Sequence, residues 1–159
     1  MKKLILLLVL LCSSPAYSRN NIKAIVGTLF DQEMGESHGF VLGADYSHYF
    51  VKAVSLNAGL IYYRNSLGDY SYNLLTADFG PYLHLWLSRS VDINLGVRFG
   101  MSHVWVDFAG VEASDNEFQM ALALGFGFWV QKVNFGFEIR LPDEKLNGWF
   151  FLFNVGFPI

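Results

Sequence analysis

From about residue 21 to its last residues, the chain places an apolar side chain at every second position. The residues between them are mostly small or polar. This period of two is that of a β-strand, in which successive side chains point to opposite faces. The three clearest runs have apolar residues at Ile93, Leu95, Val97, Phe99 and Met101; at Phe118, Met120, Leu122, Leu124, Phe126 and Phe128; and at Val133, Phe135, Phe137, Ile139 and Leu141. The pattern predicts strands with two chemically different faces.

Five further segments follow the same alternation less regularly. They lie at about 22–30, 39–50, 54–64, 74–87 and 148–157, which brings the expected total to eight strands. Most of these runs are about 9–14 residues long, whereas strands of soluble domains usually have about 5–6 residues and strands that cross a bilayer need about 9–11. The length of the runs therefore favours strands that span a membrane.

The predicted connections alternate between long and short. Long polar loops are expected near 31–38, 65–73, 107–117 and 142–147, and tight turns near 51–53, 88–91 and 131–132. The loops hold the acidic residues Asp31, Glu33, Glu36, Asp69, Asp107, Glu112, Asp115, Glu117, Asp143 and Glu144, whereas Lys52, Arg89 and Lys132 fall in the turns. Outer-membrane barrels combine long external loops with short periplasmic turns. We therefore expect an up-and-down antiparallel barrel with acidic loops outside the cell.

Side-chain volume decides which face of each strand points inward. An eight-stranded barrel has an interior that side chains just fill, or that holds one small ligand. The apolar face is composed mainly of Phe, Leu, Val, Ile and Met, which are too bulky to share that interior, whereas the other face is rich in Gly, Ala, Ser and Asn. We therefore expect the apolar face to contact lipid.

The face expected to point inward also carries charges of both signs. These residues are Asp45, Asp78, Arg98, Glu138 and Arg140. Isolated charges are costly to remove from water, whereas opposite charges in a confined interior stabilise one another. The sequence predicts a charge network inside the barrel rather than an open pore.

The last strand carries the most specific similarity to a known family. Its alternating apolar and aromatic residues are Trp149, Phe151, Phe153, Val155 and Phe157. With these residues, the chain from residue 19 onward resembles the small eight-stranded outer-membrane β-barrels typified by OmpX and the transmembrane domain of OmpA. The resemblance implies a monomeric barrel in outer-membrane lipid, inserted by the barrel assembly machinery, which reads the terminal strand. Members of the family usually end on the aromatic residue itself, whereas Pro158 and Ile159 follow Phe157 here.

The N-terminal segment has a continuous apolar run in place of the alternating pattern of the rest of the chain. Lys2 and Lys3 precede an apolar run over residues 4–12, which is too short to span a bilayer because a membrane helix needs about 20 residues. Ala16-Tyr17-Ser18 follows as a small-x-small cleavage site, so residues 1–18 are expected to be a cleaved signal peptide and 19–159 the barrel.

Charge and cysteine content narrow the possible partners. Cleavage would remove the only cysteine, Cys12, and leave 9 basic and 14 acidic residues, a formal charge of −5. A chain with this composition offers no disulfide and no thiolate metal site. Its acidic balance gives no indication of a nucleic-acid partner.

Candidate chemistry in the sequence is sparse. The histidines His38, His48, His84 and His103 have no close spacing typical of metal ligands. Ser47 with His48 and Ser102 with His103 are adjacent pairs whose side chains would point to opposite faces of a strand. No phosphate-binding loop is present either. We therefore expect no catalytic, cofactor-binding or metal site.

The sequence thus favours an integral outer-membrane barrel with a structural or surface-interaction role. Three alternatives remain open: a narrow channel for small solutes, a lipid-modifying outer-membrane enzyme, and a soluble lipocalin-like barrel that carries an apolar ligand inside.

Overall fold

A computed structural model describes residues 19–31, 37–67, 70–143 and 148–159. The expected signal peptide with Cys12, and the loop residues Glu33, Glu36, Asp69 and Glu144, lie outside the described residues. The strands are β1 (Arg19–Asp31), β2 (Ser37–Val51), β3 (Val54–Leu67), β4 (Tyr70–Trp86), β5 (Val91–Phe108), β6 (Val111–Val130), β7 (Val133–Pro142) and β8 (Gly148–Pro158).

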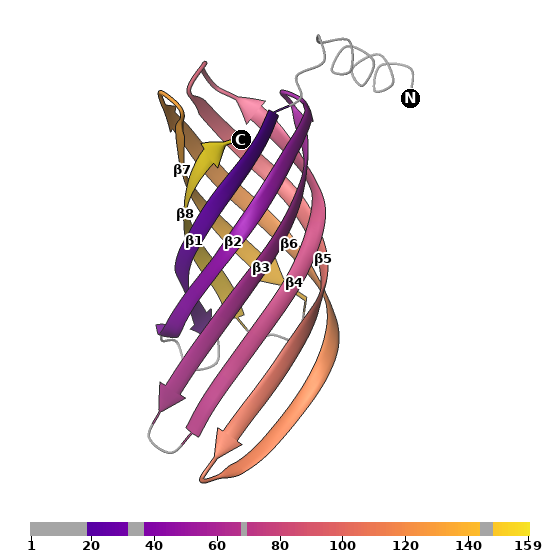
Figure 1. The fold of residues 1–159 in the computed structure, drawn as a ribbon, viewed down its shortest axis with the longest axis vertical. Helices are drawn as coiled ribbons and strands as arrows, with labels where there is room; N and C mark the ends of the chain where they lie inside the picture. Colours follow the sequence, from indigo (N-terminus) through magenta and orange to yellow (C-terminus); the bar gives the residue numbers. More distant parts are fainter. Residues whose placement is uncertain (1–18, 32–36, 68–69, 144–147) are drawn as a thin grey trace.

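These strands form one closed antiparallel barrel in sequence order (Figure 1). The barrel closes where β1 pairs with β8, from Asn21 opposite Pro158 to Asp31 opposite Gly148. The predicted fold class, an eight-stranded up-and-down barrel, is confirmed. Within the ranges that the structure describes, no helix has the length and apolarity needed to cross a membrane.

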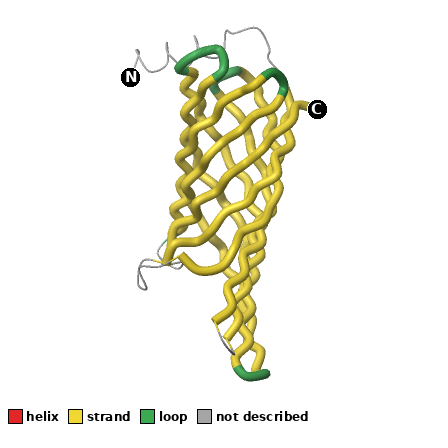
Figure 2. The backbone as a smooth tube through the Cα atoms, turned by 90° about the vertical axis from the view of Figure 1, so that its left-hand side faces the viewer, coloured by secondary structure: helices red, strands yellow, loops and turns green. Residues whose placement is uncertain are grey.

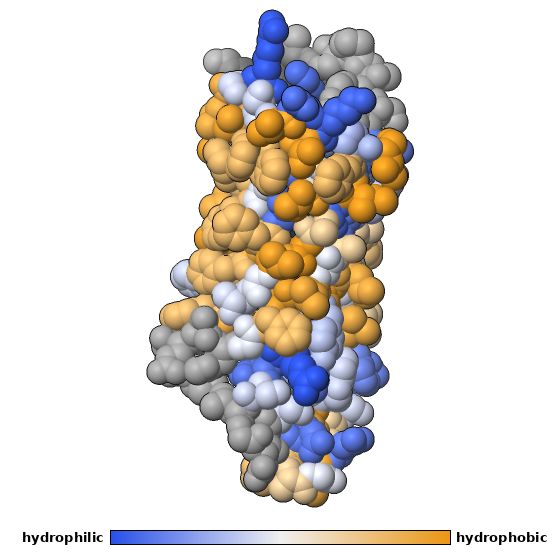
Figure 3. All heavy atoms as spheres, turned by 60° about the vertical axis from the view of Figure 1, so that its left-hand side comes forward, coloured by the Kyte–Doolittle hydropathy of each residue, from blue (hydrophilic) through white to orange (hydrophobic). Residues whose placement is uncertain are grey.

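The outer surface of the barrel is apolar. Figure 3 shows a broad apolar band around the middle of the face in view, with polar residues toward both ends. The outward side chains include Ile22, Val26, Leu42, Leu60, Phe79, Leu95, Leu122, Leu124, Phe126 and Phe153, all exposed. The soluble-carrier alternative required Leu124 and Phe126 to face an internal ligand, but their exposed fractions are 52% and 43%. The structure therefore contradicts that alternative.

Two of the four expected long loops are largely strand. The segment 107–117, expected as a polar loop, is a hairpin in which β5 runs to Phe108 and β6 starts at Val111. Ala109 and Gly110 form its two-residue turn with φ of 50° and 84°. Positive φ at both central residues is typical of the type I′ turn, whose twist matches that of the flanking strands. Asp107, Glu112, Asp115 and Glu117 therefore lie on strands and not in a loop.

β3 and β4 are extended in the same way, to Leu67 and from Tyr70, although 65–73 was expected as a loop. Together the ends of β3–β6 project beyond the rest of the barrel (Figures 1 and 2). We call residues 65–67, 70–73, 105–108 and 111–116 the surface extension. β6 pairs with β7 only from Ala121 onward, so 111–116 pair with β5 alone and form one open edge of this extension. Residues 65–67 of β3, which pair with β4 alone, form the other.

The interior differs from the expectation in the half near the long connections. Large apolar side chains fill it, although the inward face was expected to be small or polar. This apolar layer consists of Ile25, Leu29, Val41, Ile61, Tyr63, Leu74, Phe150 and Leu152, with Tyr72 and Val104 packed against it. It occupies the cross-section between the surface extension and the charged residues described next.

Candidate functional site: the charge cluster inside the barrel

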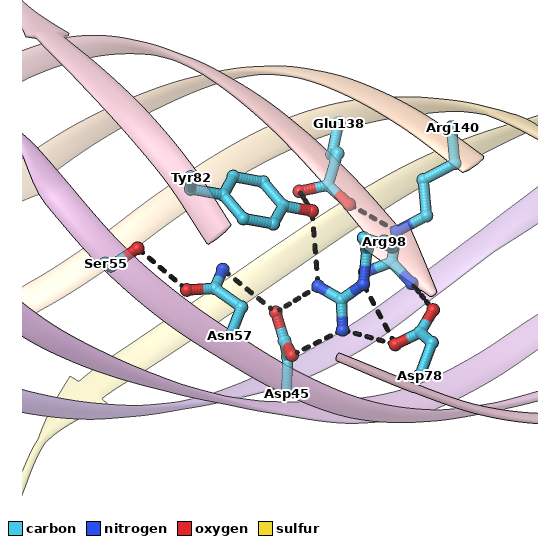
Figure 4. A network of polar contacts seen from close by, with 8 residues as sticks. All are labelled: Asp45, Ser55, Asn57, Asp78, Tyr82, Arg98, Glu138 and Arg140. Carbon is cyan, nitrogen blue, oxygen red and sulfur yellow. Dashed lines mark hydrogen bonds and ion pairs between the residues drawn. The ribbon is translucent and has the colours of Figure 1, made fainter. Parts of the chain in front are cut away.

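Five charged side chains meet inside the barrel (Figure 4). They are the five that the sequence marked by their strand parity: Asp45 on β2, Asp78 on β4, Arg98 on β5, and Glu138 and Arg140 on β7. Four separate strands supply them, and the strand period of two turns each one inward. The exposed fraction of the Arg98 residue is 1%, so its charge depends on protein partners and not on bulk water.

Arg98 is the centre of the cluster. Its Nη1 donates to Asp45 Oδ2 at 3.2 Å and its Nη2 donates to Asp45 Oδ1 at 3.0 Å, a bidentate ion pair. Its Nε donates to Asp78 Oδ1 at 2.9 Å, and Nη2 contacts the same oxygen. The planar guanidinium matches carboxylate geometry in a way that the single ammonium of lysine does not. One side chain therefore connects β5 with β2 and β4.

Arg140 extends the cluster to β7. Its Nη1 donates to Asp78 Oδ2 at 3.0 Å, so Asp78 bridges the two arginines. Its Nε donates to Glu138 Oε1 on the same strand. The Glu138 Oε2 atom accepts a hydrogen bond from the Tyr82 hydroxyl at 3.2 Å, and that hydroxyl accepts one from Arg98 Nη1 at 3.2 Å. The bonds thus close a ring through three strands.

Two glycines make room for these side chains. A Cβ atom on Gly59 would lie 2.7 Å from Arg98 Nη2 and 2.9 Å from Asp45 Oδ1, closer than atoms of these types approach. A Cβ atom on Gly96 would lie 2.6–2.7 Å from the ring of Tyr82, which packs against that strand. The small residues of the inward face are therefore needed for space at the level of the cluster.

The charges at this level balance. Asp45, Asp78 and Glu138 oppose Arg98 and Arg140, and the buried Lys23 on β1 adds a third positive charge that acts on Glu138. Opposite charges that are both hydrogen-bonded offset much of the cost of removing them from water, whereas loss of one partner exposes that cost.

A second polar group lies between the cluster and the short turns. His84 Nδ1 lies 2.8 Å from Asp92 Oδ2, and His84 Nε2 lies 2.9 Å from Ser55 Oγ. This is the connectivity of a Ser-His-Asp triad. The group was not predicted, because its three residues are separated in the sequence and none of the adjacent Ser-His pairs belongs to it. Ser55, His84 and Asp92 come from β3, β4 and β5, and their inward parity was the one available signal.

The serine of this group is enclosed by protein. Ser55 is fully buried. Its hydroxyl donates to Asn57 Oδ1 at 2.8 Å, so the serine contacts the histidine on one side and the asparagine on the other.

The two polar groups are joined into one network. Asn57 accepts from Ser55 and donates from Nδ2 to Asp45 Oδ2 at 3.5 Å, the link drawn in Figure 4. Hydrogen bonds therefore run from Asp92 near the turns to Glu138 in the charge cluster. Toward the long connections, the apolar layer follows in place of further ion pairs.

The remaining sequence-marked residues are dispersed. His48 contacts Asn20 and His103 contacts Asn116, each through Nδ1, at 2.7 and 2.8 Å. Ser102 pairs with Thr76 at 2.7 Å, and the side chain of His38 lies outside the described residues. On β8, Trp149, Phe153 and Phe157 are exposed and Phe151 and Val155 half-buried, all outward. In the described part of the chain, no three His, Cys, Asp or Glu residues are grouped to hold a metal ion.

Several solved outer-membrane barrels are similar to this structure. Neisserial surface protein A, NspA, shares 13% identity with a TM-score of 0.66, and the match covers 92% of this chain and 99% of that one. Ail, the attachment invasion locus protein of Yersinia pestis, shares 11% identity over 92% of this chain and 100% of its own, with a TM-score of 0.59. The N-terminal β-barrel domain of Pseudomonas aeruginosa OprF shares 15% identity over 91% and 100%, with a TM-score of 0.58.

These likenesses establish the fold as that of small eight-stranded outer-membrane barrels, as the sequence resemblance predicted. No protein-family model matches the sequence. No curated protein matches it significantly either.

Proposed function

We propose that this protein is a closed outer-membrane barrel that stabilises the envelope and presents the surface extension for interaction outside the cell. The observation that carries the proposal is the combination of an apolar outer belt with a filled interior. Large exposed apolar areas on a protein in water lead to association, whereas in a bilayer they contact lipid. The surface extension lies at the end with the longer connections, which is external in barrels of this kind.

The interior favours a plug over the narrow-channel alternative. Arg98 joins β2, β4 and β5 across the interior through its two aspartates. Next to this ion-paired layer lies the apolar layer, in which Leu74 and Leu152 are 1% exposed. An ion on this route would meet fixed charges and then a dry constriction, each of which opposes conduction. The proposal expects no steady conductance.

A non-enzymatic role is part of the proposal. The Ser55–His84–Asp92 group is the one described arrangement that resembles a catalytic site, and its serine is buried with its proton donated to Asn57. A fluorophosphonate probe, which reacts with activated serines, should leave the folded protein unlabelled. Labelling at Ser55 would instead establish an active nucleophile.

Assembly is proposed to depend on β8. Its outward residues Trp149, Phe151, Phe153, Val155 and Phe157 form the lipid-facing row of the strand that closes the barrel against β1. Replacing Phe157 with Ser should lower the amount of folded barrel in the outer membrane relative to Asn154→Ser, a variant at an inward position of the same strand. Equal yields of both variants would show that assembly does not depend on this row of residues.

The location is tested with intact cells. Cys12 is the only cysteine in the chain, so Val111→Cys at the tip of the surface extension places one thiol in the barrel. A membrane-impermeant maleimide should label this variant in intact cells, whereas Lys132→Cys in the β6–β7 turn should require lysis. Labelling of both positions only after lysis would contradict the proposed orientation.

The closed state is tested with purified protein. The boiled and unboiled protein should migrate differently on a gel, because a barrel closed by strand pairing resists detergent. In planar bilayers the protein should give no steady current. A large, long-lived conductance would contradict the plugged barrel and show that the protein is a channel.

A further inference from the structure

The surface extension contains a pocket with its own chemistry. It has a volume of about 520 Å³ and lies on the outward face, across β4, β5 and β6. Its lining residues are Ser71, Asn73, Trp105, Asp107, Glu112, Ala113 and Ser114. Strand register explains the grouping, since Ser71 pairs with Asp107, which pairs with Glu112, and Asn73 pairs with Trp105, which pairs with Ser114.

One wall of the pocket is aromatic and held in place. The ring of Trp105 stacks on Tyr62 of β3 at 6.0 Å between centroids. The Tyr62 hydroxyl donates to Asn73 Oδ1 at 2.8 Å, so the same tyrosine fixes both the tryptophan and the asparagine. A rigid aromatic wall of this kind gives contact area at a small entropic cost.

The asparagine leaves a hydrogen-bonding group for a ligand. Asn73 is 6% exposed, and its oxygen is taken by Tyr62. Asn73 lines the pocket, and its amide nitrogen is a donor that the bond to Tyr62 does not use. An amide N–H at the pocket wall can donate to an oxygen of a ligand.

The pocket is also acidic. Asp107 and Glu112 face each other across the hairpin, and of the Asp107 carboxylate only Oδ1 is used, by the Gly110 amide at 3.0 Å. No basic side chain lines the pocket in the part of the chain that the structure describes. Arg64, the register partner of Asn73, is exposed on β3 and lies outside the lining. Two carboxylates without a counter-charge favour a cationic ligand and repel an anionic one.

We propose that this pocket binds an amine-bearing saccharide. The ammonium group lies between Asp107 and Glu112, sugar hydroxyls pair with Asn73 and with Ser71 and Ser114, and the ring packs on the edge of the Trp105 wall. Aromatic rings and carboxylates together attract an ammonium more than either does alone. The inference rests on the proposed surface role of the extension, whose position determines which glycans reach it.

Binding is measured on the full barrel in detergent micelles by calorimetry, with a trimer of glucosamine as the amine-bearing probe. The N-acetylated trimer differs only in lacking the charge, and a heparin fragment supplies the opposite charge. The expected result is binding of the glucosamine trimer at least tenfold tighter than that of the N-acetylated trimer, with no binding of heparin. Absence of binding, equal affinity for both trimers, or preference for heparin would overturn the proposal.

Variants assign the binding to the pocket. Asp107→Asn with Glu112→Gln should weaken binding of the glucosamine trimer at least tenfold. The matched control is Asp115→Asn with Glu117→Gln, which removes the same charge from β6 on the opposite face, where these residues pair with Val104 and Ser102. Equal losses of affinity in both double variants would show that binding depends only on the net charge of the protein and not on this pocket. Binding of Ca²⁺ without the sugar would reassign the two carboxylates to a metal ion.

A competition experiment distinguishes a saccharide of the same membrane from one on another surface. Protein reconstituted in phospholipid vesicles is compared with protein in vesicles that also contain lipopolysaccharide with amine-substituted sugars. If the lipopolysaccharide blocks the trimer, the ligand belongs to the same membrane; if it does not, the ligand belongs to another surface. Calorimetry in micelles does not depend on cell location, whereas labelling of Val111→Cys does, so failure of the ligand and failure of the surface role are distinguishable.

Discussion

Arg98 of β5 and Asp45 of β2 form a two-bond ion pair across the interior of the barrel, at 3.0 and 3.2 Å. The two strands are not neighbours in the barrel wall, since β3 and β4 separate them along one side. The pair therefore joins two distant strands across the interior, and we expect the stability of the barrel to depend on it.

Replacing Arg98 with Met should lower the free energy of unfolding by about 3–5 kcal/mol, because Asp45 and Asp78 lose their shared partner and remain buried. Urea unfolding of the protein reconstituted in vesicles measures the change. The compensated variant Arg98→Met with Asp45→Asn and Asp78→Asn should recover much of the loss. An uncompensated variant as stable as the original protein would contradict this account.

The apolar layer should contribute more than the lipid face to folding. Leu152 is 1% exposed inside, and its neighbour Phe153 is 64% exposed outside. Leu152→Ala should cost about 2–5 kcal/mol, because a buried cavity replaces the lost contacts. Phe153→Ala should cost clearly less, since lipid chains fill the space left behind. The measurement is the free energy of unfolding of both variants in the same vesicles. A larger loss for Phe153→Ala than for Leu152→Ala would contradict the role of the apolar layer.

The lipid belt should reject a charge in a depth-dependent way. Leu124→Arg should destabilise the barrel by about 2–4 kcal/mol, the range for a basic residue at the membrane midplane. Val111→Arg at the tip of the surface extension should change stability by no more than about 0.5 kcal/mol, because that position lies in water. Unfolding of both variants in vesicles is the measurement. Equal tolerance at the two positions would contradict the membrane orientation.

The strands and the direction of their side chains could be predicted from the sequence. Alternation with a period of two is a property of the extended backbone itself, so it predicted eight strands and the outward direction of Leu124 and Phe126 correctly. The same parity turned Asp45, Asp78, Arg98, Glu138 and Arg140 to one face, where the structure brings them into contact. Side-chain volume alone was enough to choose which face points inward.

Other features depended on how strands pair. The hairpin at 107–117 has polar residues and was expected as a loop, because polarity alone does not distinguish a solvated strand from a loop. The apolar layer was missed, although runs such as 60–63 and 149–153 are apolar at consecutive positions. A continuous apolar run indicates apolar surroundings on both faces, which fits the apolar layer inside and the apolar outer surface of the barrel.

What the sequence by itself determined is the strand period, the strand count and the outward side of each strand, because these follow from local backbone geometry and side-chain size. Only the tertiary structure decided the partners. Ser55, His84 and Asp92, or Tyr62, Asn73 and Trp105, meet because the register of neighbouring strands brings distant residues to one level. Register is set by the whole closed barrel, since each strand must satisfy two neighbours at once, and no single segment of the sequence contains that constraint.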